Sequence, residues 1–200
     1  MIFLFYKLLK KWKLLWNQFI LKSRLRSYYH LSKKRYRIHS SFKAGSRFSI
    51  QSDLSETLLS IDENFTARDG FKIYIGHQGK LCIGKNCFFN NYCSLNCLGN
   101  IEIGNDNQFG ENVFLYDHNH RYADKDKLIS EQGYNIGDIK IGSNCWIGSN
   151  VVILKDVVIG NNVIIGAGCV IYKSIASGTV VINQQNLIEK RTNESLEELI

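Results

Sequence analysis

Isoleucine recurs at every sixth position over much of the second half of the chain. From Ile141 the sequence runs IGSNCW, IGSNVV, ILKDVV, IGNNVI, IGAGCV and IYKSIA, six consecutive units that each open with isoleucine. A short regular repeat is typical of a solenoid, in which each unit cannot bury its apolar face alone and stacks on its neighbours. We therefore predict coils of three short strands, with the opening aliphatic side chains inside. Glycine after the aliphatic residue is expected to relieve backbone strain at the corner.

The same register occurs earlier in the chain. Two runs open with Ile83, Phe89 and Leu95 and with Ile103, Phe109 and Leu115, separated by a two-residue slip at Ile101 and Glu102. Weaker echoes at Ile75 and Leu81 place the start of clear winding near residue 70. We assign the solenoid domain to residues 46–182, a basic arm to residues 1–45 and a tail to residues 183–200.

The fifth position of each unit is small and apolar. It is occupied by Val113, Val151, Val157, Val163, Cys87, Cys93, Cys145 and Cys169. Because a free cysteine behaves as a small buried hydrophobe, four of the six cysteines are assigned to the core. The chain contains no Cys-x-x-Cys pair, so we expect reduced thiols and neither disulfides nor a metal site.

The repeat is interrupted once, after Leu115. The register resumes only at Ile141, which leaves about twenty extra residues in a loop over residues 116–140. A loop of this length in a compact domain is usually functional or disordered. Its entrance holds His118 and His120, and imidazole, which titrates near pH 6.5, can accept a proton from a hydroxyl. Asp117 either orients one of these rings or serves only as a turn residue.

The first 26 residues predict a basic amphipathic helix. Apolar residues recur at spacings of three and four, and lysines fill the other side: Leu8, Trp12, Leu15 and Phe19 against Lys7, Lys10, Lys11 and Lys13. The uninterrupted apolar run at residues 1–6 is shorter than the roughly 20 residues of a spanning helix or the roughly 7 to 15 of a signal-peptide core. Export is not predicted, and we expect a cytoplasmic protein.

The charge is divided unevenly along the chain. Thirteen of the 25 Lys and Arg residues precede the first acidic residue, Asp53, although the net charge of the whole chain is only +7. Such an arm suits the anionic inner leaflet of a membrane, so residues 1–26 are expected to make peripheral contact there. The alternative is a helix that packs its apolar face on the body. Nucleic acid is disfavoured because the body offers no basic binding motif.

The six-residue repeat resembles the hexapeptide acyltransferase family, in particular its maltose, galactoside and polysaccharide O-acetyltransferase branch. The resemblance covers roughly residues 70–182. It implies an all-β fold, the left-handed parallel β-helix, with acetyl-CoA as co-substrate, a saccharide as acceptor and a homotrimer as the assembly. The handedness comes from this resemblance, since the period alone predicts only a β-solenoid.

The resemblance also assigns catalytic and acceptor-binding residues. The catalytic histidine of the family lies seventeen residues after the opening isoleucine of its coil, and that count from Ile103 reaches His120; His118 is the alternative. Trp146 matches a tryptophan beside the active site, or else shields a trimer seam. Asn90 matches an acceptor-binding position, whereas Leu98 replaces the acidic acceptor-binding residue of the galactoside branch, which leaves the acceptor open.

For the donor, the resemblance places the pantetheine arm along the outside of the solenoid. The matching positions are Ser149, Ala167, Lys173 and Lys190, and the two lysines would neutralise phosphates of CoA. The alternative is that these are only corner residues and solvated lysines. Relatives close with a Gly-x-Pro-Ala segment, whereas this chain has Ile182-Asn183-Gln184-Gln185-Asn186 and no proline, so the adenine end of the site does not carry over.

The function predicted from these features is transfer of acetyl from acetyl-CoA to a sugar hydroxyl of a cell-surface polysaccharide or lipid-linked glycan precursor, with His120 as general base. Alternatives are acetylation of a small soluble acceptor such as an antibiotic or free sugar, a zinc protein like the γ-type carbonic anhydrases with His77, His118 and His120 as ligands, and a non-catalytic scaffold.

Overall fold

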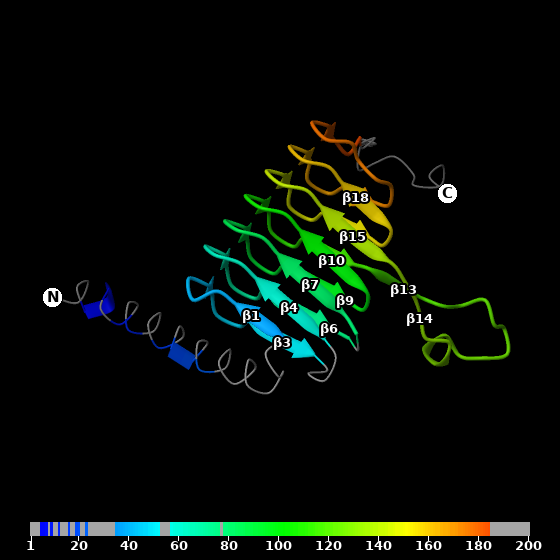
Figure 1. Cartoon of the computed structure of the whole chain (residues 1–200), viewed down its shortest axis with the longest axis horizontal. Helices are drawn as coiled ribbons and strands as arrows, with labels where there is room; N and C mark the ends of the chain where they lie inside the picture. Colours follow the sequence, from blue (N-terminus) through cyan, green and yellow to red (C-terminus); the bar gives the residue numbers. More distant parts are fainter. Residues whose placement is uncertain are drawn as a thin grey trace, which may run out of the picture.

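The structure is a computed structural model. It describes residues 35–52, 57–76 and 78–184, together with residues 5–7, 9, 12, 16, 19, 20 and 23 near the N-terminus. Three parallel sheets run the length of a single solenoid, and the chain visits them in turn (Figure 1). Each passage through the three sheets is one coil, and the described residues form six full coils and part of a seventh.

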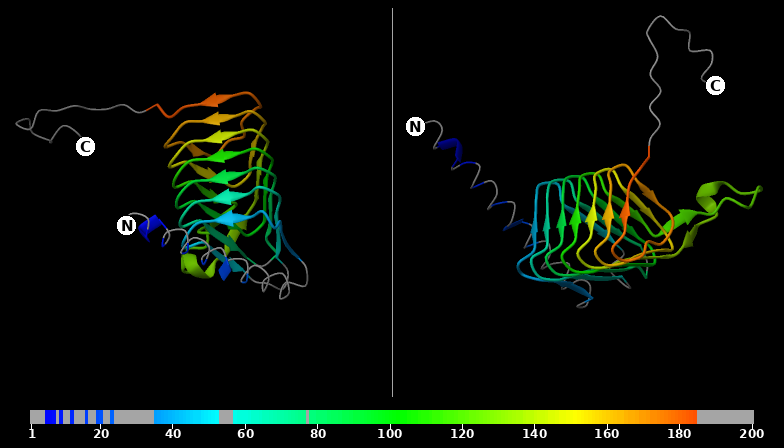
Figure 2. Two further views of the ribbon diagram at one scale, coloured as in Figure 1. Left: turned by 90° about the vertical axis from the view of Figure 1, so that its left-hand side faces the viewer. Right: turned by 90° about the horizontal axis from the view of Figure 1, so that it is seen from above.

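The first sheet contains β1 (Tyr36–Ile38), β4 (Leu58–Ile61), β7 (Lys80–Ile83), β10 (Asn100–Ile103), β15 (Asp138–Ile141) and β18 (Val157–Ile159). The second contains β2 (Lys43–Ala44), β5 (Thr66–Ala67), β8 (Phe88–Phe89), β11 (Gln108–Phe109), β16 (Trp146–Ile147), β19 (Ile164–Ile165) and β21 (Val180–Val181). The third contains β3 (Ser49–Ser52), β6 (Lys72–Ile75), β9 (Ser94–Cys97), β12 (Phe114–Tyr116), β17 (Val152–Leu154) and β20 (Val170–Ile171). The prediction of an all-β, left-handed parallel β-helix is confirmed (Figure 2).

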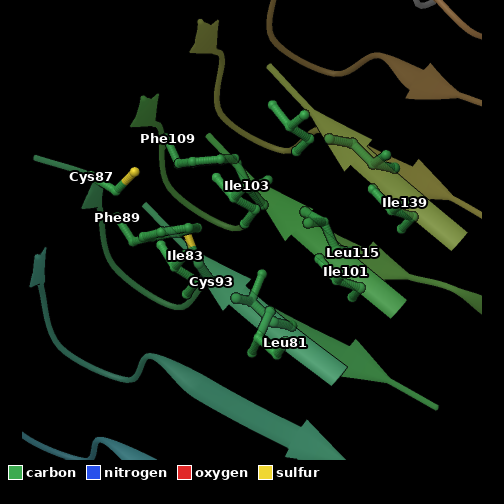
Figure 3. Packing of buried hydrophobic residues seen from close by; sticks show 14 of the residues in the cluster. Leu81, Ile83, Cys87, Phe89, Cys93, Ile101, Ile103, Phe109, Leu115 and Ile139 are labelled. Atoms are coloured by element: carbon green, nitrogen blue, oxygen red, sulfur yellow. The ribbon is translucent and has the colours of Figure 1, made fainter. Parts of the chain in front are cut away.

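The core is a set of vertical stacks of equivalent side chains. Leu81 pairs with Ile101, which pairs with Ile139, so equivalent residues of successive coils lie directly over one another. Aromatic rings fill the wider part of the interior, where Phe89 and Phe109 stack with centroids 4.1 Å apart. Figure 3 shows these side chains converging from neighbouring coils. Stacking of this kind buries a continuous apolar column and leaves the alternate residues outside.

The cysteines at the fifth position belong to this core. Cys87, Cys93, Cys145 and Cys169 are buried as predicted, Cys97 is buried beside them, and Cys82 is half-buried. Burial raises the pKa of the Cys87 and Cys93 thiols to about 11, because the thiolate is poorly solvated there. These thiols are packing residues.

The corners do not use glycine in the way that the sequence suggested. Non-glycine residues, mostly asparagine and aspartate, adopt the left-handed conformation at most corners, for example Asn144 at φ 56° and Asn162 at φ 56°. Asn and Asp tolerate this region better than other residues with a Cβ. The glycine after the aliphatic residue instead allows close stacking, since a Cβ at Gly104 would lie 2.8 Å from the carbonyl oxygen of Gly142.

The winding begins earlier than the repeat indicated. The first strand starts at Tyr36, before both the boundary at residue 46 and the clear register near residue 70. The first coil keeps the six-residue spacing at Ile38, Ala44 and Ile50, which pair with Ile61, Ala67 and Ile73 of the next coil. Tyr36 and Phe42 fill its interior beside them. Tyr36 is fully buried, and its hydroxyl contacts those of Ser52 and Thr57. The repeat is less conspicuous here than after Ile141, because alanine replaces one aliphatic residue and only Ala44 is followed by glycine.

The residues described between positions 5 and 23 are helical, and all of their side chains are exposed. They appear as the separate blue segments in Figure 1. Among the described residues, no helix has the length and apolar character needed to cross a bilayer.

Candidate active site

The interruption in the repeat leaves the solenoid at the corner between the third and first sheets. The chain exits after Tyr116, returns at Asp138, and forms a hairpin of β13 (His118–His120) and β14 (Tyr134–Ile136) with the 3-10 turn η1 (Ile129–Glu131) beyond it. The hairpin projects from the coils in Figure 1. We call this corner the loop edge; in the neighbouring coils it contains Leu98, Gly99, Lys155, Asp156 and Lys173.

Asp117 is fully buried at the base of this hairpin. Its carboxylate accepts backbone N–H groups from the preceding coil, at 2.9 and 3.0 Å from Leu98 and 2.8 Å from Gly99. The carbonyl of Asp117 accepts the N–H of Gly137 at 2.7 Å, which closes the loop where it returns. A buried carboxylate is tolerated only with such hydrogen bonds. Asp117 therefore joins two coils and both ends of the loop.

The same carboxylate holds the ring of His118. Its Oδ1 lies 2.9 Å from Nδ1 of His118, whose side chain is 14% exposed. With Nδ1–H donating to the carboxylate, Nε2 carries the lone pair, which is the tautomer required of a general base. The ring also meets the ring of Tyr134 edge-on, with centroids 5.1 Å apart. His118 is thus oriented and largely enclosed.

His120 lies on the same face of β13 but is exposed. Its ring centroid is 4.6 Å from that of Tyr134, so the tyrosine contacts both histidines. His120 also lines an open cavity of about 600 Å³ under the loop, together with Asn119, Arg121, Tyr122, Ala123, Asp124, Lys127, Glu131, Gln132 and Asn135. Its ring is therefore accessible to a polar acceptor, whereas that of His118 is not as open.

The predicted acceptor residue and two predicted donor residues lie on a different edge. Asn90, Gly110, Gly148 and Gly166 stack through backbone hydrogen bonds of successive coils at the corner between the second and third sheets, which we call the Asn90 edge. Ser149 and Ala167 follow in this stack, and the Ser149 hydroxyl accepts the N–H of Glu111 at 3.1 Å. The amide oxygen of Asn90 accepts from Arg68 at 3.3 Å. The width of the third sheet separates this edge from the histidines.

The remaining predicted residues are placed as follows. Trp146 points outward from the second sheet and is 60% exposed, between Gln108 and Ile164 of the adjacent coils. Lys173 is exposed at the loop edge, two coils beyond the histidines, with its ammonium 5.6 Å from the Tyr172 ring centroid. Lys190 and His77 lie outside the described residues. Over the part of the chain that the structure describes, no three His, Cys, Asp or Glu side chains gather as metal ligands would.

One chain therefore assembles Asp117, His118 and His120 but keeps them apart from Asn90, Ser149 and Ala167. Sequence reasoning missed two participants, Tyr134 and the backbone N–H groups at Leu98 and Gly99. The pairing of β13 with β14 is antiparallel and lies outside the repeat, so the period contains no information about Tyr134. The adjacent Asp117 and His118 in the sequence did indicate a possible carboxylate–imidazole pair.

Comparisons with known proteins agree with this architecture. The family model described as bacterial transferase hexapeptide (six repeats) matches residues 138–173. A protein of Escherichia coli (strain K12), named as a lipopolysaccharide biosynthesis O-acetyl transferase, WbbJ, is 29% identical over 142 residues, which is 68% of this chain and 72% of that protein.

Two solved structures share the fold. A mutant of AntD, an N-acyltransferase from Bacillus cereus in complex with dTDP-4-amino-4,6-dideoxyglucose and coenzyme A, is similar with a TM-score of 0.58 and 18% identity, over 82% of this chain and 95% of that one. The hexapeptide-repeat-containing acetyltransferase VCA0836 from Vibrio cholerae has a TM-score of 0.51 and 17% identity, over 86% and 93%. The chain thus carries the bacterial transferase hexapeptide repeat over residues 138–173 and is similar in sequence and fold to hexapeptide-repeat acyltransferases.

Proposed function

We propose that this chain is an acetyl-CoA-dependent O-acetyltransferase that modifies a sugar hydroxyl in a cell-surface polysaccharide or a lipid-linked glycan precursor. The observation that carries the proposal is the histidine pair at the base of the loop, with a buried carboxylate on one ring. The name of the Escherichia coli relative supports O-acetylation, and the sugar nucleotide and coenzyme A in the AntD complex support the two substrate classes.

The reaction needs a base because a neutral hydroxyl is a weak nucleophile. A histidine Nε2 takes the hydroxyl proton while the oxygen attacks the carbonyl carbon of the thioester. The C–S bond then breaks, the acetyl group remains on the sugar oxygen, and the proton passes to the departing CoA sulfur. A well-placed general base contributes about 10²- to 10⁴-fold to such a step.

His120 is the base in this proposal. Its ring is exposed on the cavity under the loop, where a saccharide hydroxyl can reach it, and its position is the one that the family resemblance assigns. His118 is the second candidate, since its Nδ1 contact with Asp117 orients the ring as in a carboxylate-histidine pair. If His120 is the base, the role of the Asp117–His118 pair is to hold the hairpin on which His120 lies.

The separation of the two edges supports a site shared between subunits. His120 lies at the loop edge, whereas Asn90, Ser149 and Ala167 lie on the Asn90 edge, across the third sheet. A second copy that presents its Asn90 edge to the loop edge would bring donor and base together. This is the reason to propose a homotrimer as the active form, with Trp146 lining the acceptor side and Lys173 and Lys190 binding CoA phosphates.

The test is an acceptor screen with the full chain and acetyl-CoA, in which free CoA and acetylated product are both quantified. The panel contains lipid-linked saccharides, polysaccharide fragments, free sugars and an aminoglycoside antibiotic. On the best acceptor, His120→Ala should lower kcat by about 10²-fold or more, and the matched control His39→Ala, at an exposed histidine outside the cavity, should keep most of it. Full activity in His120→Ala with loss in His118→Ala moves the base to His118; full activity in both refutes histidine catalysis.

A further inference from the structure

Large apolar side chains are exposed among the described residues near the N-terminus. Phe5, Leu9, Trp12, Trp16, Phe19 and Ile20 are helical and exposed; we call them the arm stripe. Trp12 is 70%, Trp16 62% and Phe19 66% exposed, and the rings of Trp16 and Phe19 contact each other with centroids 6.0 Å apart. At 3.6 residues per turn these positions fall within an arc of about 100°. An aromatic-rich stripe of this size is an interaction surface.

The charge of the same segment restricts the partner. Residues 1–52 contain 13 Lys and Arg residues and no Asp or Glu, and 7 of the 13 lie within residues 1–26. All 18 acidic residues of the chain follow from Asp53 onward. The partner of the arm stripe must therefore accept apolar side chains and be negatively charged around them.

We propose that residues 1–26 dock on the surface of an anionic phospholipid bilayer, with the aromatic side chains of the arm stripe inserted at the headgroup level. Tryptophan is favoured at that depth because its ring is apolar and its N–H remains hydrated. Each Lys or Arg near an anionic surface adds further attraction. A basic amphipathic helix of this kind lies in the plane of the interface, with its apolar face toward the acyl chains.

Two other occupants fit less well. A second copy of the arm would bring two segments of uniformly positive charge together, which disfavours self-association. Single-stranded nucleic acid would use the aromatic rings as stacking platforms but offers nothing to Leu9 and Ile20. The proposal is separate from the acetyl transfer reaction, and a lipid-linked acceptor would place both substrate and enzyme on the same surface.

The experiment measures partition of the full chain onto vesicles by co-sedimentation. Vesicles of phosphatidylcholine alone are compared with vesicles that also contain phosphatidylglycerol, at low and high salt. We expect binding only to the anionic vesicles and weaker binding at high salt. Trp12→Ser with Trp16→Ser should lower the partition coefficient about tenfold or more, and Lys10→Gln with Lys11→Gln should do the same.

Matched controls on the solenoid are Tyr172→Ser for an exposed aromatic ring and Lys72→Gln with Lys80→Gln for the two charges; these should bind as the unaltered chain does. In a Trp146→Phe protein only Trp12 and Trp16 fluoresce, since the chain has three tryptophans. Without vesicles, their emission should be that of water-exposed indole. With anionic vesicles, it should shift to the blue.

Several results would overturn the proposal. Equal binding to neutral and anionic vesicles, or no binding to either, would contradict docking on an anionic bilayer. Blue-shifted emission without vesicles would indicate that the arm packs on the body. A lower molecular mass for the Trp12→Ser, Trp16→Ser protein than for the unaltered chain would indicate self-association. Acetyl transfer to a soluble saccharide without vesicles should be unchanged in the arm variants. Loss of vesicle binding and loss of catalysis are thus separate readouts.

Discussion

The carboxylate of Asp117 receives the backbone N–H groups of Leu98 and Gly99 from one coil while its Oδ1 lies 2.9 Å from Nδ1 of His118 in the loop. In the galactoside branch an acidic side chain stands at the position of Leu98. Here the carboxylate bonded to this residue is that of Asp117, which is fully buried and accepts the backbone N–H of the leucine. The loop and the solenoid therefore share one buried charge.

Asp117→Asn tests this arrangement. The amide retains the shape but turns an N–H₂ group toward a backbone N–H, and an unsatisfied buried donor costs about 1–3 kcal/mol of unfolding free energy. We expect kcat to fall more than KM rises, because the altered side chain displaces His118 and the hairpin. In a His118→Ala background the same change should have little further effect on kcat. If the effects of Asp117→Asn and His118→Ala on kcat were additive, the two residues would not act as one unit.

Phe89 should be among the most sensitive core positions. Its ring contacts those of Phe65, Phe71 and Phe109 at centroid distances of 5.6, 4.9 and 4.1 Å, so it is shared by three coils. Phe89→Ala should lower the free energy of unfolding by about 3–5 kcal/mol, measured by urea titration. Phe88→Ala, the outward neighbour on the same strand, is the control. Equal losses would argue against the stack as the main source of stability.

Asn107 is a second sensitive position, for a polar reason. Its side chain is fully buried, donates to the carbonyls of Gly104 and Gly142 at 2.9 and 2.8 Å, and accepts the N–H of Cys145 at 2.8 Å. Asn107→Ala leaves the buried partner groups without hydrogen bonds, a loss of about 1–3 kcal/mol. Thermal unfolding should show it, with exposed Asn119→Ala as control. An unchanged melting temperature would mean that water replaces the amide.

Alkaline conditions should destabilise the chain through its buried thiols. The pKa of Cys93 is raised from 9.0 to about 11, so between these values the unfolded state loses a proton that the folded state keeps. Stability from this thiol is complete below pH 9 and falls by about 1.4 kcal/mol per pH unit up to pH 11.

The comparison that isolates this effect is Cys93→Ala against the unaltered chain, by urea unfolding at pH 8 and pH 10. The gap between the two proteins should narrow as the pH rises. Val113→Ala, which removes a buried side chain from the same slot of the next coil without a titrating group, should keep a constant gap. A constant gap for Cys93→Ala would contradict the raised pKa.

The fold was largely predictable because every sixth residue reports on the same environment. Ile141, Ile147 and Ile153 each open a unit and each lie in the column. The first coil was not predicted, because its units at Ile38, Ala44 and Ile50 keep the spacing but only one of them has the glycine that marks the later repeat. The loop could be located but not folded from sequence, because the contact of Tyr134 with His118 and His120 depends on a hairpin with no repeat.

The candidate site was likewise predictable in part. Residue counting placed His120, and the structure supplied what surrounds it: the cavity, the tyrosine and the Asp117–His118 contact. The split between the loop edge and the Asn90 edge is set by the same register, since Asn90 follows a strand of the second sheet and the histidines follow a strand of the third.

The loop leaves and re-enters the solenoid without disturbing the stack. Asn100 pairs with Asp138 just as it pairs with Lys80, although one neighbour precedes it directly and the other follows the whole excursion. The two ends meet where the Gly137 N–H bonds the Asp117 carbonyl. The stack therefore does not depend on the length of the segment between them, and we expect changes beyond the hairpin of β13 and β14 to leave the register of the coils beneath unchanged.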